Sequence, residues 1–252
     1  MKNKPLVTIT IPCFNAVEYT KICLESLVRY SDIPFELILV NNGSADGTKK
    51  YFDCVKKHLK SSFLKKLTVI NYKENKGVPH ALNLGVALSS TEYFIYVNND
   101  VVFSPNWLSK LYYAASNSAK NIAVIGTMFN NVKPKFALSD INKTAKAVEI
   151  ANYRKTEYAP TVHGLCMTVK KEVFNDIGMF DEKFFPCFGE DIEFCDRAKK
   201  AGYKLLLAKD VFVYHFWNKA TRTREFKTLY GNIKTIMHKT YKLYNIDKKY
   251  RT

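Results

Sequence analysis

The sequence predicts an α/β protein in which a mostly parallel sheet is flanked by helices. In the first hundred residues, runs of β-branched and aromatic side chains alternate with stretches that carry apolar residues at helical spacing. Because strands joined through a helix pair in parallel by right-handed crossovers, this alternation favours one sheet covered on both faces. Hydrophobic residues make up 47% of the 252 residues, which is enough for a substantial core.

The spacing of the hydrophobic residues predicts the following strands and helices in chain order. Strands are expected at 6–11, 35–40, 67–70 and 93–97, with helices at 19–30, 48–60 and 80–88. Beyond residue 100, strands are expected at 123–126, 164–169, 204–208 and 211–214, with helices at 105–116, 171–177 and 190–201. The stretch 130–160 shows no clear period and is rich in Lys, Asn and Thr, so we interpret it as a functional loop or lid.

The C-terminal segment 219–252 is basic and amphipathic. Its apolar residues recur at helical spacing, so it predicts a helical tail that follows a main domain over 1–218. Ten Lys or Arg residues against two acidic residues give this segment a charge of +8, half of the net +16 of the chain. Such a tail can bind nucleic acid, or an anionic membrane surface at about 1 kcal/mol per basic residue.

Composition argues against several classes of protein. No apolar run approaches the length of a membrane-spanning helix, and the first residues lack the apolar core of a signal peptide, so a cytoplasmic location is expected. The six cysteines are scattered, with no two at C-x-x-C spacing, which favours free thiols. No histidine and cysteine stand at the spacing of zinc ligands.

Short polar side chains follow each of the first four predicted strands. Any one of these loops alone is an ordinary turn, because Asn and Gly tolerate positive φ. Four such strand ends at one rim, the last of them acidic, predict a ligand site there, since open α/β sheets bind ligands outside the carboxyl ends of their strands. The candidate binding residues are Pro12, Phe14, Asn15, Asn41, Asn42, Ser44, Asn75, Gly77, Asn98 and Asn99, with Asp100 as a candidate metal ligand.

A second acidic cluster opens a predicted helix at Glu190 and Asp191. Acidic residues stabilise a helix N-terminus, so these two side chains could simply cap the helix. They could equally supply a general base opposite the metal-holding carboxylate Asp100, and both roles are compatible.

The order of these motifs resembles the inverting glycosyltransferases of family two. The resemblance extends over about 6–217 and is greatest to the bacterial branch with rhamnosyl- and other surface-polysaccharide transferases. It rests on the segments 8–15, 40–48, 75–77 with Asn83, 98–100, 178–185, 190–191 and 202–203.

The resemblance implies a GT-A fold that binds a nucleotide-diphospho-sugar with Mn²⁺ or Mg²⁺. It assigns 1–100 to the nucleotide and 101–218 to the acceptor. Asn98 to Asp100 stand where the family has its Asp-x-Asp metal motif, and only Asp100 is acidic here. One carboxylate can suffice, because Mg²⁺ is commonly held by one or two carboxylates together with phosphates and water. His215 is implied as a further metal or phosphate contact, and Gly164 begins the strand under the donor sugar.

The same resemblance implies that Asp191 is the catalytic base and that Glu190 orients the acceptor or supports the loop of Asp191. Asn41 and Asn42 stand where the family usually has Asp at one or both positions, which keeps hydrogen-bonding groups but removes charge and leaves the nucleotide base open. Trp217 and Phe188 could stack on an acceptor sugar, although core packing is the commoner role of aromatic residues.

The leading hypothesis is therefore an enzyme that transfers a hexosyl or deoxyhexosyl unit to a glycan or lipid-linked glycan. The basic tail 219–252 would place it at the inner face of the cell membrane. The rival is a polyanion- or nucleic-acid-binding α/β protein without transferase activity, although no specific nucleic-acid motif is present. A nucleotidyltransferase is disfavoured, because the loop after the first strand lacks a glycine- and arginine-rich phosphate loop.

Overall fold

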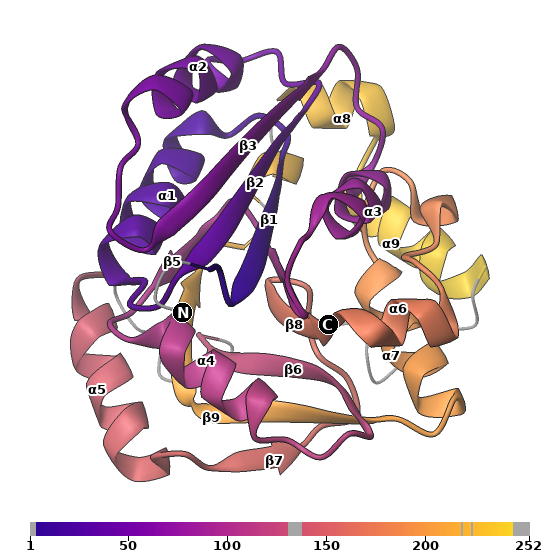
Figure 1. Cartoon of the computed structure of the whole chain (residues 1–252). Coiled ribbons are helices and arrows are strands. Elements are labelled where there is room, and N and C mark those ends of the chain that lie inside the picture. The colour runs from indigo at the N-terminus through magenta and orange to yellow at the C-terminus, as the bar shows by residue number, and fades with distance from the viewer. Residues whose placement is uncertain (1–3, 131–137, 218, 223, 244–252) are drawn as a thin grey trace.

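The computed structural model describes residues 4–130, 138–217, 219–222 and 224–243. In these residues nine strands form one sheet with the order β3-β2-β1-β4-β8-β6-β9-β5, and β7 pairs with β9 at the side (Figure 1). The strands are β1 (Val7–Cys13), β2 (Phe35–Asn42), β3 (Leu64–Tyr72), β4 (Tyr93–Val97), β5 (Val101–Phe103), β6 (Ile122–Phe129), β7 (Thr156–Tyr158), β8 (Cys166–Lys170) and β9 (Lys204–His215).

The first half of the sheet is parallel, as the alternation of strands and helices predicts. β1 lies between β2 and β4, β3 extends the sheet beyond β2, and all three pairings are parallel. The connecting helices are α1 (Val17–Tyr30), α2 (Thr48–His58) and α3 (Val78–Leu88). Since parallel strands end at the same rim, the polar residues that follow β1, β2 and β4 meet at one edge.

The second half of the sheet is mixed. β8 is antiparallel to both β4 and β6, β9 is parallel to β6, and β5 and β7 are antiparallel to β9. Its helices are α4 (Trp107–Ser116), α5 (Ile141–Asn152), α6 (Lys171–Ile177) and α7 (Glu190–Lys200), with short 3₁₀ turns η1 (Leu138–Asp140) and η2 (Glu182–Phe184). The predicted α/β class is confirmed, with parallel pairing concentrated in the first half.

Two apolar clusters hold most of the helices to the sheet. One packs side chains of α1, α2 and α4 against β1, β2 and β4, and includes Leu24, Phe52 and Trp107. The other packs α3, α6 and α7 against β4 and β8. No helix in the described residues is long and apolar enough to cross a membrane.

The interpretation of 130–160 as an irregular loop is wrong over much of its length. The segment contains α5 and β7, while 131–137 lie outside the described residues. α5 buries only a narrow stripe, in which Ile141 and Ala145 pack on Val102 and Phe212. A stripe of one large and one small buried residue gives a weak helical period in the sequence. The two strands expected at 204–208 and 211–214 form the single strand β9.

The predicted helical tail is divided into two helices. A 3₁₀ turn η3 (Ala220–Arg222) leads into α8 (Arg224–Tyr230), and α9 (Ile233–Leu243) follows. Gly231, which has φ +81, separates the two helices, and this backbone conformation favours glycine. Residues 244–252 of the predicted tail lie outside the described residues. Figure 1 shows α8 and α9 beside α3 and the α6–α7 region, so this part of the tail lies against the main domain.

Candidate active site

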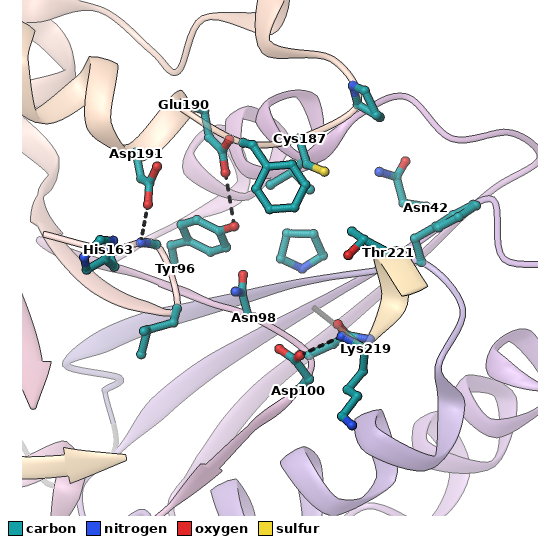
Figure 2. Close-up of a pocket in the computed structure, with 18 of the residues that line it drawn as sticks. Asn42, Tyr96, Asn98, Asp100, His163, Cys187, Glu190, Asp191, Lys219 and Thr221 are labelled. Atoms are coloured by element: carbon teal, nitrogen blue, oxygen red, sulfur yellow. Dashed lines mark hydrogen bonds between the residues drawn. The ribbon is translucent and has the colours of Figure 1, made fainter. Parts of the chain in front are cut away.

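A cavity of about 200 Å³ lies at the rim where β1, β2 and β4 end. Its lining comes from these strand ends, from the N-terminus of α7, from the end of β9 and from the first part of the tail. Figure 2 shows the acidic pair of α7 on one side of this cavity and Asp100 on another. Asp100 and the Glu190–Asp191 pair, which lie about ninety residues apart in the sequence, therefore share one pocket.

Asp100 and His215 form the first group. His215 Nε2 lies 2.9 Å from Asp100 Oδ1, and both side chains are buried. The backbone N–H of Lys219 donates to Asp100 Oδ2 at 3.2 Å. Burial raises the pKa of Asp100, but its hydrogen bond to His215 and the charge of that ring outweigh burial and leave the pKa below its ordinary value. Asp100 is therefore a carboxylate at neutral pH.

The backbone of His215 is fixed by Asn130. Asn130 Nδ2 donates to the carbonyl of His215 at 3.1 Å, and the N–H of His215 donates to Asn130 Oδ1 at 2.7 Å. Trp217 packs on the imidazole with a ring-centre separation of 4.9 Å. The buried Nδ1 atom of His215 has no hydrogen-bond partner within the part of the chain that the structure describes. These contacts hold the ring in one orientation beside Asp100.

This donor pair fits a divalent cation that is completed by phosphate. It presents one carboxylate and one imidazole to the cavity, and Mn²⁺ or Mg²⁺ commonly takes one or two protein groups together with phosphates and water. Among the described residues no group of three or more His, Cys, Asp or Glu side chains gathers into a metal site. An ion held here would therefore depend on a bound phosphate for affinity.

Asp191 belongs to the second group and is anchored by two backbone N–H groups. Gly164 N donates to Asp191 Oδ2 at 2.7 Å (Figure 2), and Ile192 N donates to Asp191 Oδ1 at 2.9 Å. Gly189 precedes the helix with φ +96, and a Cβ there would lie 2.7 Å from the ring of Phe184. The carboxylate is thus positioned at the cavity wall by the loop that begins β8 and by the start of α7.

Glu190 is buried and bonded on one side only. Its Oε1 accepts a hydrogen bond from the Tyr96 hydroxyl at 3.3 Å, and no described residue hydrogen-bonds to its Oε2. Burial and the adjacent Asp191 carboxylate raise the pKa of Glu190 to about 8. At neutral pH Glu190 is mostly protonated, so it can donate a hydrogen bond.

The predicted nucleotide loops divide into two sets. Pro12, Phe14, Asn42, Asn75, Asn98, Asn99 and Gly164 line the cavity. Asn15, Asn41, Ser44, Gly77 and Asn83 lie outside that lining and join loops to one another.

Hydrogen bonds of the second set join neighbouring loops to one another. Asn15 N donates to Ser44 Oγ at 2.9 Å, and Asn15 Oδ1 accepts from Ala45 N at 2.8 Å, which ties the loop after β1 to the loop after β2. Asn83 joins α3 to Phe180 by accepting from its N–H and donating to its carbonyl. These residues fix the loops that surround the cavity.

Asn42 is held in one orientation by two backbone groups. Its Nδ2 donates to the carbonyl of Gly77 at 3.0 Å, and its Oδ1 accepts from Lys76 N at 2.9 Å. A carboxylate at this position would set an oxygen against the Gly77 carbonyl. The amide of Asn42 thus has a local structural role in this loop.

Several lining residues escape sequence reasoning. Tyr96 is an ordinary strand residue in the sequence, and Cys187 is a lone thiol. Lys219, Thr221, Phe226 and Met237 come from the tail. Phe226 is buried and packs on Phe14, with ring centres 6.3 Å apart. The regular spacing of apolar residues marks the tail as a helix, but no signal in it indicates which surface it covers.

Comparison with known proteins gives a consistent result. The family described as "Glycosyl transferase family 2" matches residues 8–178. An uncharacterized glycosyltransferase of Haemophilus influenzae is 24% identical over 211 residues, covering 80% of this chain and 62% of the relative. Glycosyltransferase AglE of Haloferax volcanii is 25% identical over 213 residues, covering 84% and 67%. The chain thus spans roughly two thirds of the length of these relatives.

Solved structures share the fold at low identity. A mannosyltransferase from Pyrobaculum calidifontis, solved with GDP-Man and Mn²⁺, has a TM-score of 0.63 and 18% identity, covering 90% of this chain and 60% of that one. TarS 1-349 of S. aureus has a TM-score of 0.61 and 15% identity, covering 97% and 73%. The sheet and its helices therefore have the GT-A arrangement. Because the family match extends over more than half of the sequence, the chain belongs to glycosyl transferase family 2.

Proposed function

We propose that the protein transfers a sugar from a nucleotide-diphospho-sugar to a hydroxyl group, with inversion at the anomeric carbon. The observation that carries this proposal is the single cavity with the Asp100–His215 pair on one wall and the anchored Asp191 carboxylate on another. A leaving group and an attacking hydroxyl need opposite chemistry on opposite sides of one carbon, and the two walls can supply it.

In the proposed reaction the acceptor oxygen attacks the anomeric carbon and forms the new glycosidic bond. The bond from that carbon to the diphosphate oxygen breaks, and the nucleoside diphosphate leaves with the electron pair. Asp191 accepts the proton of the acceptor hydroxyl, which is the role of a general base. Glu190, protonated at neutral pH, donates a hydrogen bond that orients a sugar hydroxyl.

Asp100 and His215 are the residues that would hold Mn²⁺ or Mg²⁺ together with the diphosphate. Such an ion, when bound, neutralises charge that develops on the leaving diphosphate. Asn42, Phe14 and Asn75 would contact the nucleoside, because they line the same cavity at the ends of the neighbouring strands.

For the acceptor we propose a glycan or a lipid-linked glycan, and for the donor a hexosyl or deoxyhexosyl nucleotide as in surface-polysaccharide transferases of this family. The tail keeps Lys227, Lys234 and Lys239 exposed although Phe226 is buried, so its basic side remains available to an anionic membrane. We therefore propose a peripheral position at the inner face of the cell membrane.

The test is a thermal-stability screen against a panel of nucleotide sugars with and without Mn²⁺. The proposal predicts that one donor raises the melting temperature only with the metal, and that Asp100→Asn abolishes this shift. A parallel titration with duplex DNA tests the rival function. Tight, salt-sensitive DNA binding with no response to any donor would favour a polyanion-binding protein and contradict the transferase.

A further inference from the structure

Tyr96 touches both halves of the acidic pair at the start of α7. It belongs to β4, in the middle of the sheet, its side chain is buried, and it lines the cavity. Figure 2 shows its hydroxyl directed at Glu190, and this hydroxyl donates to Glu190 Oε1 at 3.3 Å. A side chain from the centre of the sheet therefore reaches the group beside the candidate base.

The ring of Tyr96 supports the backbone that anchors Asp191. A Cβ on Gly164 would lie 2.3 Å from Cε1 and 3.1 Å from Cδ1 of this ring, so the Gly164 backbone packs directly on it. The N–H of Gly164 in turn donates to Asp191 Oδ2 at 2.7 Å. The position of the Asp191 carboxylate therefore depends on where the Tyr96 ring lies.

The apolar core holds this ring in place. Tyr96 belongs to the cluster that packs α3, α6 and α7 against β4 and β8, and its ring centre lies 6.4 Å from that of Phe180. Phe180 packs in turn on Phe194 of α7, with ring centres 4.7 Å apart. A phenylalanine would fill the same space, because the hydroxyl is not needed for these apolar contacts. What the hydroxyl adds is the hydrogen bond to Glu190.

Glu190 lies in surroundings that offer few other donors to fix its direction. It is buried, and its Oε2 lacks a hydrogen-bond partner in the described part of the chain. The titratable groups that face it are Asp191 of α7, Tyr96 of β4 and Cys187 in the loop before α7. Burial raises the pKa of the Cys187 thiol, so this group carries no charge at neutral pH.

We propose that Tyr96 is a positioning residue for sugar transfer, because its hydroxyl orients Glu190 and its ring holds the Gly164 N–H that anchors Asp191. Since Tyr96 donates to Oε1, the proton of neutral Glu190 sits on Oε2 and is free to be donated. The catalytic part of this inference rests on the proposed function, in which Glu190 orients a sugar hydroxyl and Asp191 is the base.

The Tyr96 hydroxyl should have a measurable effect on the titration of Glu190. A donor to a carboxyl oxygen favours the ionised form, so this hydroxyl lowers the pKa of Glu190, although burial and the Asp191 charge hold that pKa at about 8. Tyr96→Phe keeps the ring and removes the donor. It should raise the pKa of Glu190 by about 0.5–1, as expected for the loss of one ordinary hydrogen bond.

The first measurement is an NMR titration of the full-length protein with isotope-labelled glutamate carboxyl groups. The Glu190 signal is identified by its loss in Glu190→Gln, and we expect Tyr96→Phe to move the midpoint of this signal to higher pH. Tyr93→Phe is the matched control, because Tyr93 is a buried tyrosine of the same strand that packs on Tyr112 and lies outside the cavity lining. The control should leave the midpoint unchanged.

The second measurement is the turnover of sugar transfer with the donor that the thermal screen identifies. Tyr96→Phe should lower kcat about three- to tenfold without changing donor affinity. In a Glu190→Ala background the same substitution should change kcat by less than about twofold, because the hydroxyl acts through Glu190. The alkaline limb of the pH–rate profile should move to higher pH together with the NMR midpoint, since the neutral form of Glu190 is the active one.

The third measurement is hydrogen exchange at the Gly164 N–H, which tests the role of the ring. Tyr96→Phe should keep this N–H protected, whereas Tyr96→Met should increase its exchange. Methionine is flexible enough to fill the space of the ring, but it cannot support the Gly164 backbone in one position. Tyr96→Leu is the second variant without a ring, for use if Tyr96→Met does not fold.

The outcomes separate this inference from the proposed function. An unchanged Glu190 midpoint in Tyr96→Phe, with sugar transfer still present in the unchanged protein, would overturn the positioning role and leave the transferase intact. A raised midpoint in a protein that uses no donor would overturn the proposed function and support the contact that orients Glu190.

Two further results would overturn parts of the inference. If Tyr96→Phe lowers kcat as much in the Glu190→Ala background, the hydroxyl acts on the substrate directly and not through Glu190. If the Gly164 N–H is as protected without the ring as with it, the ring does not hold the anchor of Asp191.

Discussion

At the scale of single residues, the site depends on how two adjacent carboxyl groups differ in environment. Glu190 and Asp191 are neighbours in sequence, yet Asp191 accepts two backbone N–H groups, whereas one oxygen of the buried Glu190 has no hydrogen-bond partner among the described residues. Backbone donors stabilise a carboxylate, and burial disfavours it. This difference supports the proposed roles of Asp191 as the base and of Glu190 as a hydrogen-bond donor.

The raised pKa of Glu190 predicts a pH-dependent stability. Between its ordinary value of 4.5 and about 8, the folded state binds a proton that the unfolded state releases, so Glu190 lowers stability as pH rises through this window. Glu190→Gln removes the titration and keeps an acceptor for Tyr96. Relative to the unchanged protein, it should gain stability between pH 5 and pH 9, by at most a few kcal/mol at ~1.4 kcal/mol per pKa unit.

Urea unfolding of both proteins at the two pH values measures this gain, because other titrating groups cancel in the difference. An equal stability difference at pH 5 and pH 9 would mean that Glu190 is ionised in the folded protein, and its role as a donor would then fail.

Gly164 is a second residue on which the site geometry depends. A Cβ at this position would lie 2.3 Å from Cε1 of Tyr96, whose ring is buried. Gly164→Ala should therefore displace Tyr96 or the N–H that holds Asp191, at a cost of about 1–3 kcal/mol for overpacking. Gly47→Ala is the matched control, since its nearest contact would be Val17 at an ordinary 3.8 Å. Equal melting temperatures for the two variants would contradict this account.

At the scale of elements, the tail is part of the pocket. Phe226 of α8 is 2% exposed and packs on Phe14, while Tyr230 packs on Phe14 and Phe185. The loop that follows β1 is thus covered by a helix from the other end of the sequence.

Loss of this packing should release α8 and weaken donor binding. Phe226→Ala should increase hydrogen exchange across α8 and α9 and reduce affinity for a nucleoside diphosphate, because truncating a buried Phe costs about 3–5 kcal/mol in a core. Leu229→Ala on the same helix is the control, since Leu229 is 64% exposed. Unchanged exchange in Phe226→Ala would show that other contacts hold the helix.

At the scale of the whole molecule, the cavity joins strand ends of the first half to the loop before α7 and to the tail. Mn²⁺ and a nucleoside diphosphate should therefore stabilise the protein together and weakly apart, because the described residues contain no group of three or more His, Cys, Asp or Glu side chains that could hold the ion without a phosphate. Ligand at about a hundred times its dissociation constant adds about 2.7 kcal/mol. Calorimetry of each ligand alone and of both measures this coupling, and full stabilisation by Mn²⁺ alone would contradict it.

The sequence predicts much of this architecture, and where it fails the cause is tertiary. The strands of the first half are found where β-branched runs predict them, because a strand buried on both faces is apolar throughout. α5 is missed because it buries only Ile141 and Ala145 among its residues. Phe226 covers the loop after β1 by packing on Phe14, and the spacing of apolar residues within the tail cannot reveal so distant a partner.

The candidate site follows the same division. Asp100 and the cavity-lining asparagines follow strands that end at the same edge of the sheet, so their meeting there is expected from the topology. Asn41 instead donates to Asn71 Oδ1 of the neighbouring strand at 3.0 Å, and nothing in its own sequence context distinguishes it from Asn42. Which of two similar side chains faces a ligand is decided by packing between strands.

The most direct test of the central claim is the turnover of Asp191→Asn with the donor that the screen identifies. Removal of a general base typically costs 10²–10⁴-fold in rate, so sugar transfer should fall about a hundredfold or more while donor affinity stays unchanged. Asp196→Asn on the same helix, where Asp196 pairs with Lys199 at 2.7 Å and lies outside the cavity lining, should retain full activity. Full turnover by Asp191→Asn would contradict the assignment of the base and the mechanism built on it.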